Sequence, residues 1–236
     1  MTTRPIFGTA HEEAYAHLRD AILSGEYTGG TRLNLDEIAR AVGASRMPVR
    51  EAIRQLAAEG LVTIRPNRGV VVTALTSDDI VELFDTRAVL EGLAARVAAP
   101  RMDADALAEL ETVLARMERS RGSAPAWLRY HDEFHSTICR LSGRPRLVEQ
   151  AALYRRMVEP YLRVHVGVYD PPEIGGSEHS TLVQALATRD PARAEAAMRR
   201  HVELGAAYVV DVVKNTERAR AGTQKTIGSR ERGGRR

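Results

Sequence analysis

The sequence contains one cysteine, Cys139, and no apolar run that approaches the roughly 20 residues needed to span a bilayer. A single cysteine cannot form a disulfide within the chain, so a reducing compartment is expected. The N-terminal stretch MTTRPIFGTA also lacks the apolar core of a signal peptide. These absences predict a cytoplasmic protein that has no membrane partner.

Three common catalytic signatures are missing as well. The sequence has no nucleophile elbow, no phosphate-binding P-loop and no glycine fingerprint of a dinucleotide-binding fold. Enzymes that depend on these motifs are excluded, and the enzymatic alternative considered below is a metal-dependent hydrolase.

The bulk composition is that of a globular protein with an unevenly distributed charge. Of 236 residues, 44% are apolar and 28% are charged, which suits one large domain or two modest ones. Residues 218–236 hold seven Arg or Lys against one Glu, a net +6, so the whole-chain charge of +3 leaves −3 for residues 1–217. The segment 218–236 lacks apolar periodicity and is predicted to be a disordered basic tail, either solvated or touching DNA phosphates.

The rest of the chain falls into two regimes. Residues 10–75 alternate short helical patterns with glycine-containing turns and end in a β-branched stretch, whereas later residues are helical almost throughout. We therefore expect two domains, residues 8–75 and residues 77–217. They join near ALTSDDI, where Ser77 is the predicted N-cap of the next helix.

The first regime has the pattern of a winged helix-turn-helix. Helices are expected over about 12–24, 34–43 and 45–59, and the stretch LVTIRPNRGVVV (61–72) predicts a β-hairpin. The second and third helices are separated by a few residues only, as in DNA-binding helix-turn-helix motifs.

Positive charge is concentrated on the third predicted helix and on the hairpin. Arg46, Arg50 and Arg54 recur every four residues and share one exposed helix face. Arg65 and Arg68 follow in the hairpin. A recognition helix and its wing meet phosphates and base edges with such groups, so this region is predicted to bind DNA.

The stretch GASRMPVREAIRQLAAEGLVTIRPNRGVVV closely resembles the DNA-binding domain of GntR-family transcriptional regulators. The later stretches LFDTRAVLEGLAARVAA, HDEFHSTICRLSG and EHSTLVQALATRDPARAEAAMRRHVE resemble the FCD effector domain of the FadR-like subfamily. The resemblance implies a mostly α fold, with an N-terminal winged helix-turn-helix of three helices and a β-hairpin wing. An all-helical FCD-type bundle of about six helices would follow.

For the first domain the resemblance implies contacts with operator DNA. Together with Arg54 from the charge pattern, the predicted DNA-binding residues are Ser45, Arg46, Arg50, Arg54, Arg65, Arg68 and Gly69. Arginines near the start of the helix suit bidentate contacts to guanine. Asp36 stands where some relatives place a basic DNA-contacting residue, and an acidic side chain is not expected to serve in that way.

Four histidines of the second regime lie along apolar helix faces. His131 and His135 are four residues apart, and they share a face with Leu128 and Ile138, while His179 aligns with Leu182 and Leu186, and His201 with Ala194 and Leu204. One inward histidine is usually a hydrogen-bonded core residue, but four would each need a partner of their own. They therefore predict a transition-metal site inside the bundle.

The resemblance adds detail to this site. Many FCD domains hold a metal with an Asp or Asn and three His at these places, and His131 stands at the acidic position. Four neutral imidazoles favour zinc or nickel, with one divalent transition metal per chain. The resemblance also places Arg87 in the cavity as a clamp for an effector carboxylate, with Glu91 as its partner. The simpler reading of these two residues is an i, i+4 ion pair.

A metallohydrolase is the alternative function. Zinc proteases of the H-E-x-x-H type need Glu directly after the first His, as the general base for the metal-bound water. The stretch YHDEFH has Asp132 in that slot, and Glu133 lies about 100° further round the helix.

The expected function is regulatory. The resemblance implies a homodimer on a palindromic operator, because two-fold protein symmetry mirrors two-fold DNA symmetry. A small carboxylate metabolite bound in the helical domain would change operator affinity.

Overall fold

The computed structural model of the protein describes residues 9–66, 68–168 and 176–233. The chain divides into two compact units, Met1–Ala74 and Leu75–Arg236, and each is described by itself. The division lies within the junction ALTSDDI.

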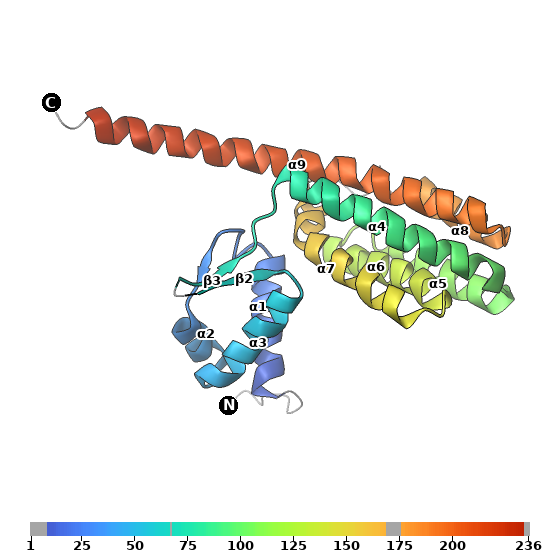
Figure 1. Cartoon of the computed structure of the whole chain (residues 1–236), viewed down its shortest axis with the longest axis horizontal. Helices are drawn as coiled ribbons and strands as arrows, with labels where there is room; N and C mark the ends of the chain where they lie inside the picture. Colours follow the sequence, from blue (N-terminus) through green and yellow to red (C-terminus); the bar gives the residue numbers. More distant parts are fainter. Residues whose placement is uncertain (1–8, 67, 169–175, 234–236) are drawn as a thin grey trace. The chain divides into compact units, whose positions relative to one another are not determined.

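The first unit contains three helices and a small antiparallel sheet (Figure 1). The elements in chain order are α1 (Ala10–Leu23), β1 (Arg32–Leu33), α2 (Leu35–Val42), α3 (Arg46–Ala58), β2 (Val62–Arg65) and β3 (Gly69–Val72). The strand order is β1-β3-β2, and β2 and β3 form the predicted hairpin with Val62 opposite Val72 and Arg65 opposite Gly69. This arrangement is a winged helix-turn-helix.

The core of this unit forms where the predicted helix stripes meet. Leu18 of α1, Ile38 of α2 and Leu56 of α3 are buried together with Val70 and Val72 of the sheet. Gly43 ends α2 in the left-handed conformation at φ 65°, where an L side chain would be strained. The α2–α3 turn therefore follows directly from the sequence.

The sheet has one strand more than predicted. β1 pairs with β3, with Arg32 opposite Val71 and Leu33 opposite Val70. Two residues carry no alternating pattern long enough to indicate a strand. The pairing depends on β3 and not on the local sequence.

The second unit is a helical bundle (Figure 1). Its helices are α4 (Ser77–Ala98), the short 3₁₀ helix η1 (Ala99–Arg101), α5 (Ala104–Arg119), α6 (Ala124–Leu141), α7 (Pro145–Val168), α8 (Gly176–Ala187) and α9 (Pro191–Gly233). Helix α4 packs along α9, and α5 packs against α6. Phe134, Ile138, Leu182, Leu186 and Met198 are fully buried in a core that all these helices help to build.

Helix α4 begins one residue earlier than predicted. Thr76, not Ser77, is its N-cap: the Thr76 hydroxyl accepts a hydrogen bond from Asp79 N at 3.1 Å, and Asp79 Oδ2 accepts one from Thr76 N at 2.8 Å. Asp79 Oδ2 also accepts from the Thr76 hydroxyl at 2.7 Å, and the bonds that this carboxylate accepts from the Thr76 backbone and hydroxyl lower its pKa. A reciprocal capping box satisfies two backbone donors at once, and this favours Thr76 over its neighbour.

The basic segment after residue 217 also differs from expectation. Helix α9 continues to Gly233, so residues 218–233 are helical and not irregular, while 234–236 lie outside the described residues. No proline follows Pro191 in the sequence, so none interrupts the helix that begins there. Among the described residues, no helix combines the length and apolar content needed to cross a membrane.

Candidate functional site

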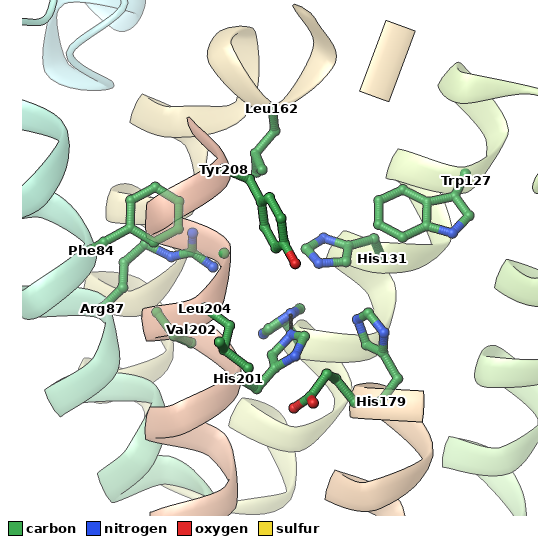
Figure 2. A pocket seen from close by; sticks show the side chains of 13 residues that line it. Phe84, Arg87, Trp127, His131, Leu162, His179, His201, Val202, Leu204 and Tyr208 are labelled. Atoms are coloured by element: carbon green, nitrogen blue, oxygen red, sulfur yellow. Dashed lines mark hydrogen bonds between the residues drawn. The ribbon is translucent and has the colours of Figure 1, made fainter. Parts of the chain in front are cut away.

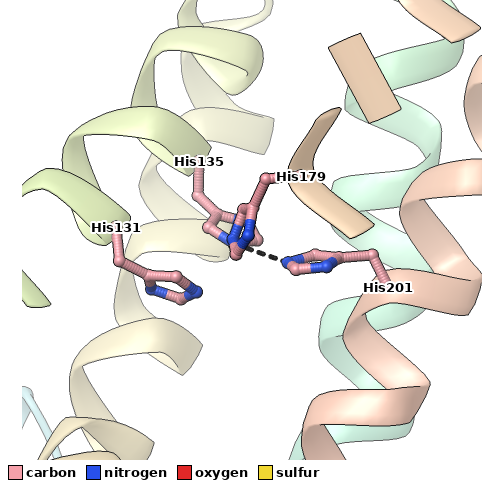
Figure 3. Close-up of side chains that lie close together, drawn as sticks. All are labelled: His131, His135, His179 and His201. Carbon is pink, nitrogen blue, oxygen red and sulfur yellow. Dashed lines mark hydrogen bonds between the residues drawn. The ribbon is translucent and has the colours of Figure 1, made fainter. Parts of the chain in front are cut away.

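Three helices of the bundle bring four histidines to one place (Figure 3). His131 and His135 project from α6, His179 from α8 and His201 from α9. Their ligand nitrogens all lie within 4.8 Å of one another. The structure thus brings together all four of the predicted metal-binding residues.

The spacing of these nitrogens suits a transition metal. His135 Nε2 and His201 Nε2 are 3.2 Å apart. In a tetrahedral site with metal–nitrogen distances of about 2.0–2.1 Å, ligand nitrogens lie about 3.3–3.4 Å apart.

Two of the four imidazoles, those of His131 and His201, are held in the neutral form. Burial, together with His135 and His179, holds the pKa of His131 well below its ordinary value. Burial, together with His179 and His135, has the same effect on the pKa of His201. A neutral imidazole offers a nitrogen lone pair to a metal, whereas an imidazolium does not.

A buried carboxylate orients one of the rings. His135 Nδ1 donates a hydrogen bond to Glu91 Oε2 at 2.6 Å, and both side chains are buried. Burial alone would raise the pKa of Glu91, but Arg87 and His135 hold that pKa far below its usual range. With the proton on Nδ1, Nε2 of His135 faces the cluster as an acceptor, which is the arrangement common among metal-binding histidines.

Arg87 lies next to the cluster and is only 2% exposed. Its Nε donates to Glu91 Oε1 at 2.9 Å, and its guanidinium lies 4.7 Å above the Phe84 ring. The predicted i, i+4 pair therefore exists, but it is buried inside the bundle and not on its surface. Glu91 accepts from only one of the five N–H groups of Arg87, so the guanidinium can bind a further acceptor.

A cavity of about 50 Å³ adjoins these groups, with space for roughly three to five waters. Figure 2 shows Arg87, Tyr208, His131, His179 and His201 around it, with Trp127 beside His131. The Trp127 and His131 rings are stacked, with centroids 4.9 Å apart. The remaining wall is formed by Phe84, Leu162, Val202, Leu204 and Gly205, with the carboxyl-bearing Glu178 among them. Arg87 and the histidines thus face largely apolar walls, an arrangement that suits a small anion.

The residue that a hydrolase would need as its base lies elsewhere. Asp132 accepts a hydrogen bond from Arg155 Nε at 3.0 Å, and its side chain is 64% exposed. Glu133 lies 3.9 Å from Arg116 on a half-exposed face. Neither carboxylate contributes to the histidine cluster, so the arrangement does not support hydrolysis.

The predicted DNA-binding residues all lie exposed on the first unit. Ser45 occupies the N-cap of α3 without a side-chain capping bond, and Arg46, Arg50 and Arg54 follow along the helix. Arg65, Arg68 and Gly69 are exposed in the wing. Helix α3 and the wing thus both present cations to solvent.

Two residues near these sites were not predicted from the sequence. Arg155 of α7 is buried and donates to Ser136 Oγ at 2.8 Å as well as to Asp132. Its charge helps to lower the pKa of Glu91. Asp36 forms a two-pronged pair with Arg46. Neither pairing has a local sequence signal, because both partners come together only through helix packing.

A winged helix-turn-helix followed in one chain by a bundle with a buried polar cavity defines a ligand-responsive DNA-binding regulator. A family model described as "Bacterial regulatory proteins, gntR family" matches residues 10–72, and one described as "FCD domain" matches residues 82–204. The chain belongs to the gntR family of bacterial regulatory proteins and carries an FCD effector-binding domain. It is a transcription regulator.

Named relatives agree with this assignment. The chain is 30% identical over 203 residues to the HTH-type transcriptional repressor GlaR of Escherichia coli K12, covering 80% of this chain and 91% of the relative. It is 32% identical over 194 residues to a probable D-xylose utilization operon transcriptional repressor of Paenarthrobacter nicotinovorans, covering 80% and 82%.

Solved structures share the fold. Escherichia coli McbR/YncC superposes with a TM-score of 0.72 at 20% identity, over 87% of this chain and 99% of that one. A GntR transcriptional regulator from Rhodococcus sp. RHA1 gives a TM-score of 0.64 at 27% identity, over 85% and 97%. The predicted family and fold class are thus confirmed.

Proposed function

We propose that a small carboxylate, bound beside a metal in the helical unit, controls the affinity of this regulator for its operator. The observation that carries the proposal is the convergence of four buried or half-buried histidines with the buried Arg87 around one cavity. A core built only for stability would not place five such groups together, because each has to be desolvated.

The metal site would consist of His131, His135, His179 and His201. The donor set is all imidazole, which suits one divalent transition metal per chain, zinc or nickel. When bound, such an ion supplies a Lewis acid that can anchor a carboxylate oxygen. Glu91 fixes the ring of His135 for this purpose.

Arg87 would bind the same carboxylate from the other side. Its guanidinium lines the cavity and is held against Glu91 and Phe84, so it is oriented before the effector arrives. Glu91 is then a positioning residue for both Arg87 and His135. The small cavity favours a small acid, and a larger one would have to displace wall side chains.

The first unit would bind a palindromic operator as part of a homodimer in the cytoplasm. The DNA contacts would come from Ser45, Arg46, Arg50, Arg54, Arg65, Arg68 and Gly69. Two-fold symmetric protein contacts require two-fold symmetric half-sites. To regulate, the effector must bind the DNA-competent and DNA-incompetent states with unequal affinity.

A thermal-shift screen tests the effector class. Monocarboxylates, dicarboxylates and sugar acids are compared with their methyl esters, which remove the charge and add one methyl group. We expect acids to raise Tm and esters to have no effect, because only a carboxylate can bind Arg87 and the metal together. The Arg87→Lys variant should lose this response, whereas Arg96→Lys, an exposed arginine on the same helix, should keep it. Stabilisation by esters and acids alike would contradict the proposal.

A further inference from the structure

Asp36 and Arg46 form a salt bridge between the second and third helices of the helix-turn-helix. Arg46 lies in the first turn of α3 and Asp36 in the first turn of α2. Arg46 Nε donates to Asp36 Oδ1, and Arg46 Nη2 donates to Asp36 Oδ2 at 2.7 Å. The pair is therefore bidentate, and this fixes the plane of the guanidinium as well as its position.

Stability does not explain this pair. The side chains of Arg46 and Asp36 are 66% and 51% exposed. Solvent-exposed ion pairs contribute little to folding, because water screens them and both side chains lose rotamer freedom. A carboxylate on a DNA-binding surface also repels phosphates. Asp36 stands beside the recognition helix, so we expect another effect of this residue to favour DNA binding and to offset the repulsion.

The favourable effect can come from the guanidinium N–H groups of Arg46 that Asp36 does not use. A guanidinium carries five N–H groups, one on Nε and two on each terminal nitrogen. Asp36 uses the Nε–H and one Nη2–H, which form one side edge of the group. The end edge, with one hydrogen on each terminal nitrogen, is left for another acceptor. Guanine O6 and N7 in the major groove accept two parallel N–H bonds of this kind.

We propose that Asp36 is a positioning residue that holds Arg46 end-on toward a guanine of the operator and so sets sequence specificity. The inference rests on the proposed function, in which α3 is the recognition helix and Arg46 contacts base edges. Asp36 was not predicted as a DNA-binding residue, and it acts here without touching DNA. The opposite role, in which Asp36 keeps Arg46 away from DNA, makes the contrary prediction that removing Asp36 strengthens binding to the operator.

The test begins with selection of binding sites from a library of random duplexes, using the full-length protein and the Asp36→Ala and Asp36→Asn variants. The wild type is expected to select a palindrome with a fixed G·C pair in each half-site. Both variants should lose the preference at that pair and keep it elsewhere. In Asp36→Asn the amide matches the shape of the carboxylate but accepts with its one oxygen only, so this variant separates loss of pairing from loss of shape.

Affinities are then measured for three duplexes: the selected operator, the same duplex with that G·C pair changed, and unrelated DNA. The ratio of the first two affinities gives the discrimination at this base pair. We expect Asp36→Ala to reduce discrimination at this pair about tenfold, in the range of one bidentate base contact. Its affinity for unrelated DNA should stay equal or rise, because a negative charge is removed. Asp105→Ala, which removes an exposed aspartate from the first turn of α5 in the other unit, is the matched control and should leave the discrimination unchanged.

A double variant shows whether Asp36 acts through Arg46. In an Arg46→Ala background, Asp36→Ala should cause no further loss of discrimination. An unchanged preference in Asp36→Ala, a further loss in the double variant, or tighter operator binding would each overturn the inference. A wild type that selects no sequence would instead refute the proposed function, and the inference with it.

Discussion

Glu91 and His135 are linked across two helices by a hydrogen bond of 2.6 Å between Glu91 Oε2 and His135 Nδ1. The same carboxylate accepts from Arg87 Nε at 2.9 Å through its other oxygen. One buried acid therefore orients a proposed metal-binding residue and a proposed effector-binding residue together. Metal affinity and effector affinity should consequently both depend on Glu91.

Replacing this acid by its amide tests the first dependence. Glu91→Gln keeps the shape but weakens the acceptor for His135 Nδ1–H, so the imidazole is less basic and less well oriented. We expect zinc affinity to fall about 10–100-fold, as is typical for outer-shell partners of metal-binding histidines. Competition with a fluorescent chelator measures this, and Glu109→Gln, a glutamate in an exposed pair with Arg140, should bind zinc like the wild type.

Metal content tests the cluster itself. Protein purified without a His-tag should contain about one transition metal per chain, because four imidazoles can complete a tetrahedral site. The His135→Ala/His179→Ala variant should lose it, since two ligands cannot retain the ion against a chelator. His17→Ala, which alters a histidine of α1, serves as the control. A metal-free wild type that still responds to effector would argue against the site.

The recognition helix is tested by Arg50→Ala. Arg50 is exposed on α3 one turn after Arg46, where a guanidinium reaches bases or phosphates. We expect at least a tenfold loss of operator affinity in an anisotropy assay, in the range of one strong base contact. Arg119→Ala in α5 removes the same charge from the other unit and should change little. Normal operator binding by Arg50→Ala would rule out α3 as the recognition helix.

The sequence was sufficient for the features that local pattern determines. The helix stripes of the first unit, the left-handed Gly43 and the hairpin follow from periodicity and turn residues. The inward positions of His131 and His135 follow from their i, i+4 spacing on α6. Convergence of these two with His179 and His201 was inferable because all four occupy apolar faces, and such faces meet in a bundle core.

Features that depend on packing could not be read from the sequence. The strand β1 exists only because β3 lies beside it. Arg155 looks like any helix-surface arginine, yet it is 6% exposed and bound to residues of α6. The pairing of Asp36 with Arg46 spans ten positions and requires the α2–α3 turn to bring two helix starts together. Residues 218–233 are helical, although their composition indicated disorder.

The single cysteine provides the last prediction, a pH-dependent one. Burial, with a smaller contribution from Glu91, raises the pKa of the Cys139 thiol to about 11, against an ordinary value of 9.0. At pH 8 the reactive thiolate is therefore about a hundredfold rarer than in an exposed cysteine. Native protein should react with iodoacetamide at least about a hundredfold more slowly than protein unfolded in urea.

The sign of the stability effect follows from the same shift. Because the pKa is raised on folding, the folded state favours the neutral thiol, and this contribution is fully present below about pH 9. It is lost as the pH rises from about 9 to 11, since the unfolded chain ionises first. Urea unfolding over this range should show a smaller decline for Cys139→Ala than for the wild type. Rapid alkylation of the native protein at pH 8 would show instead that the thiol is open to solvent.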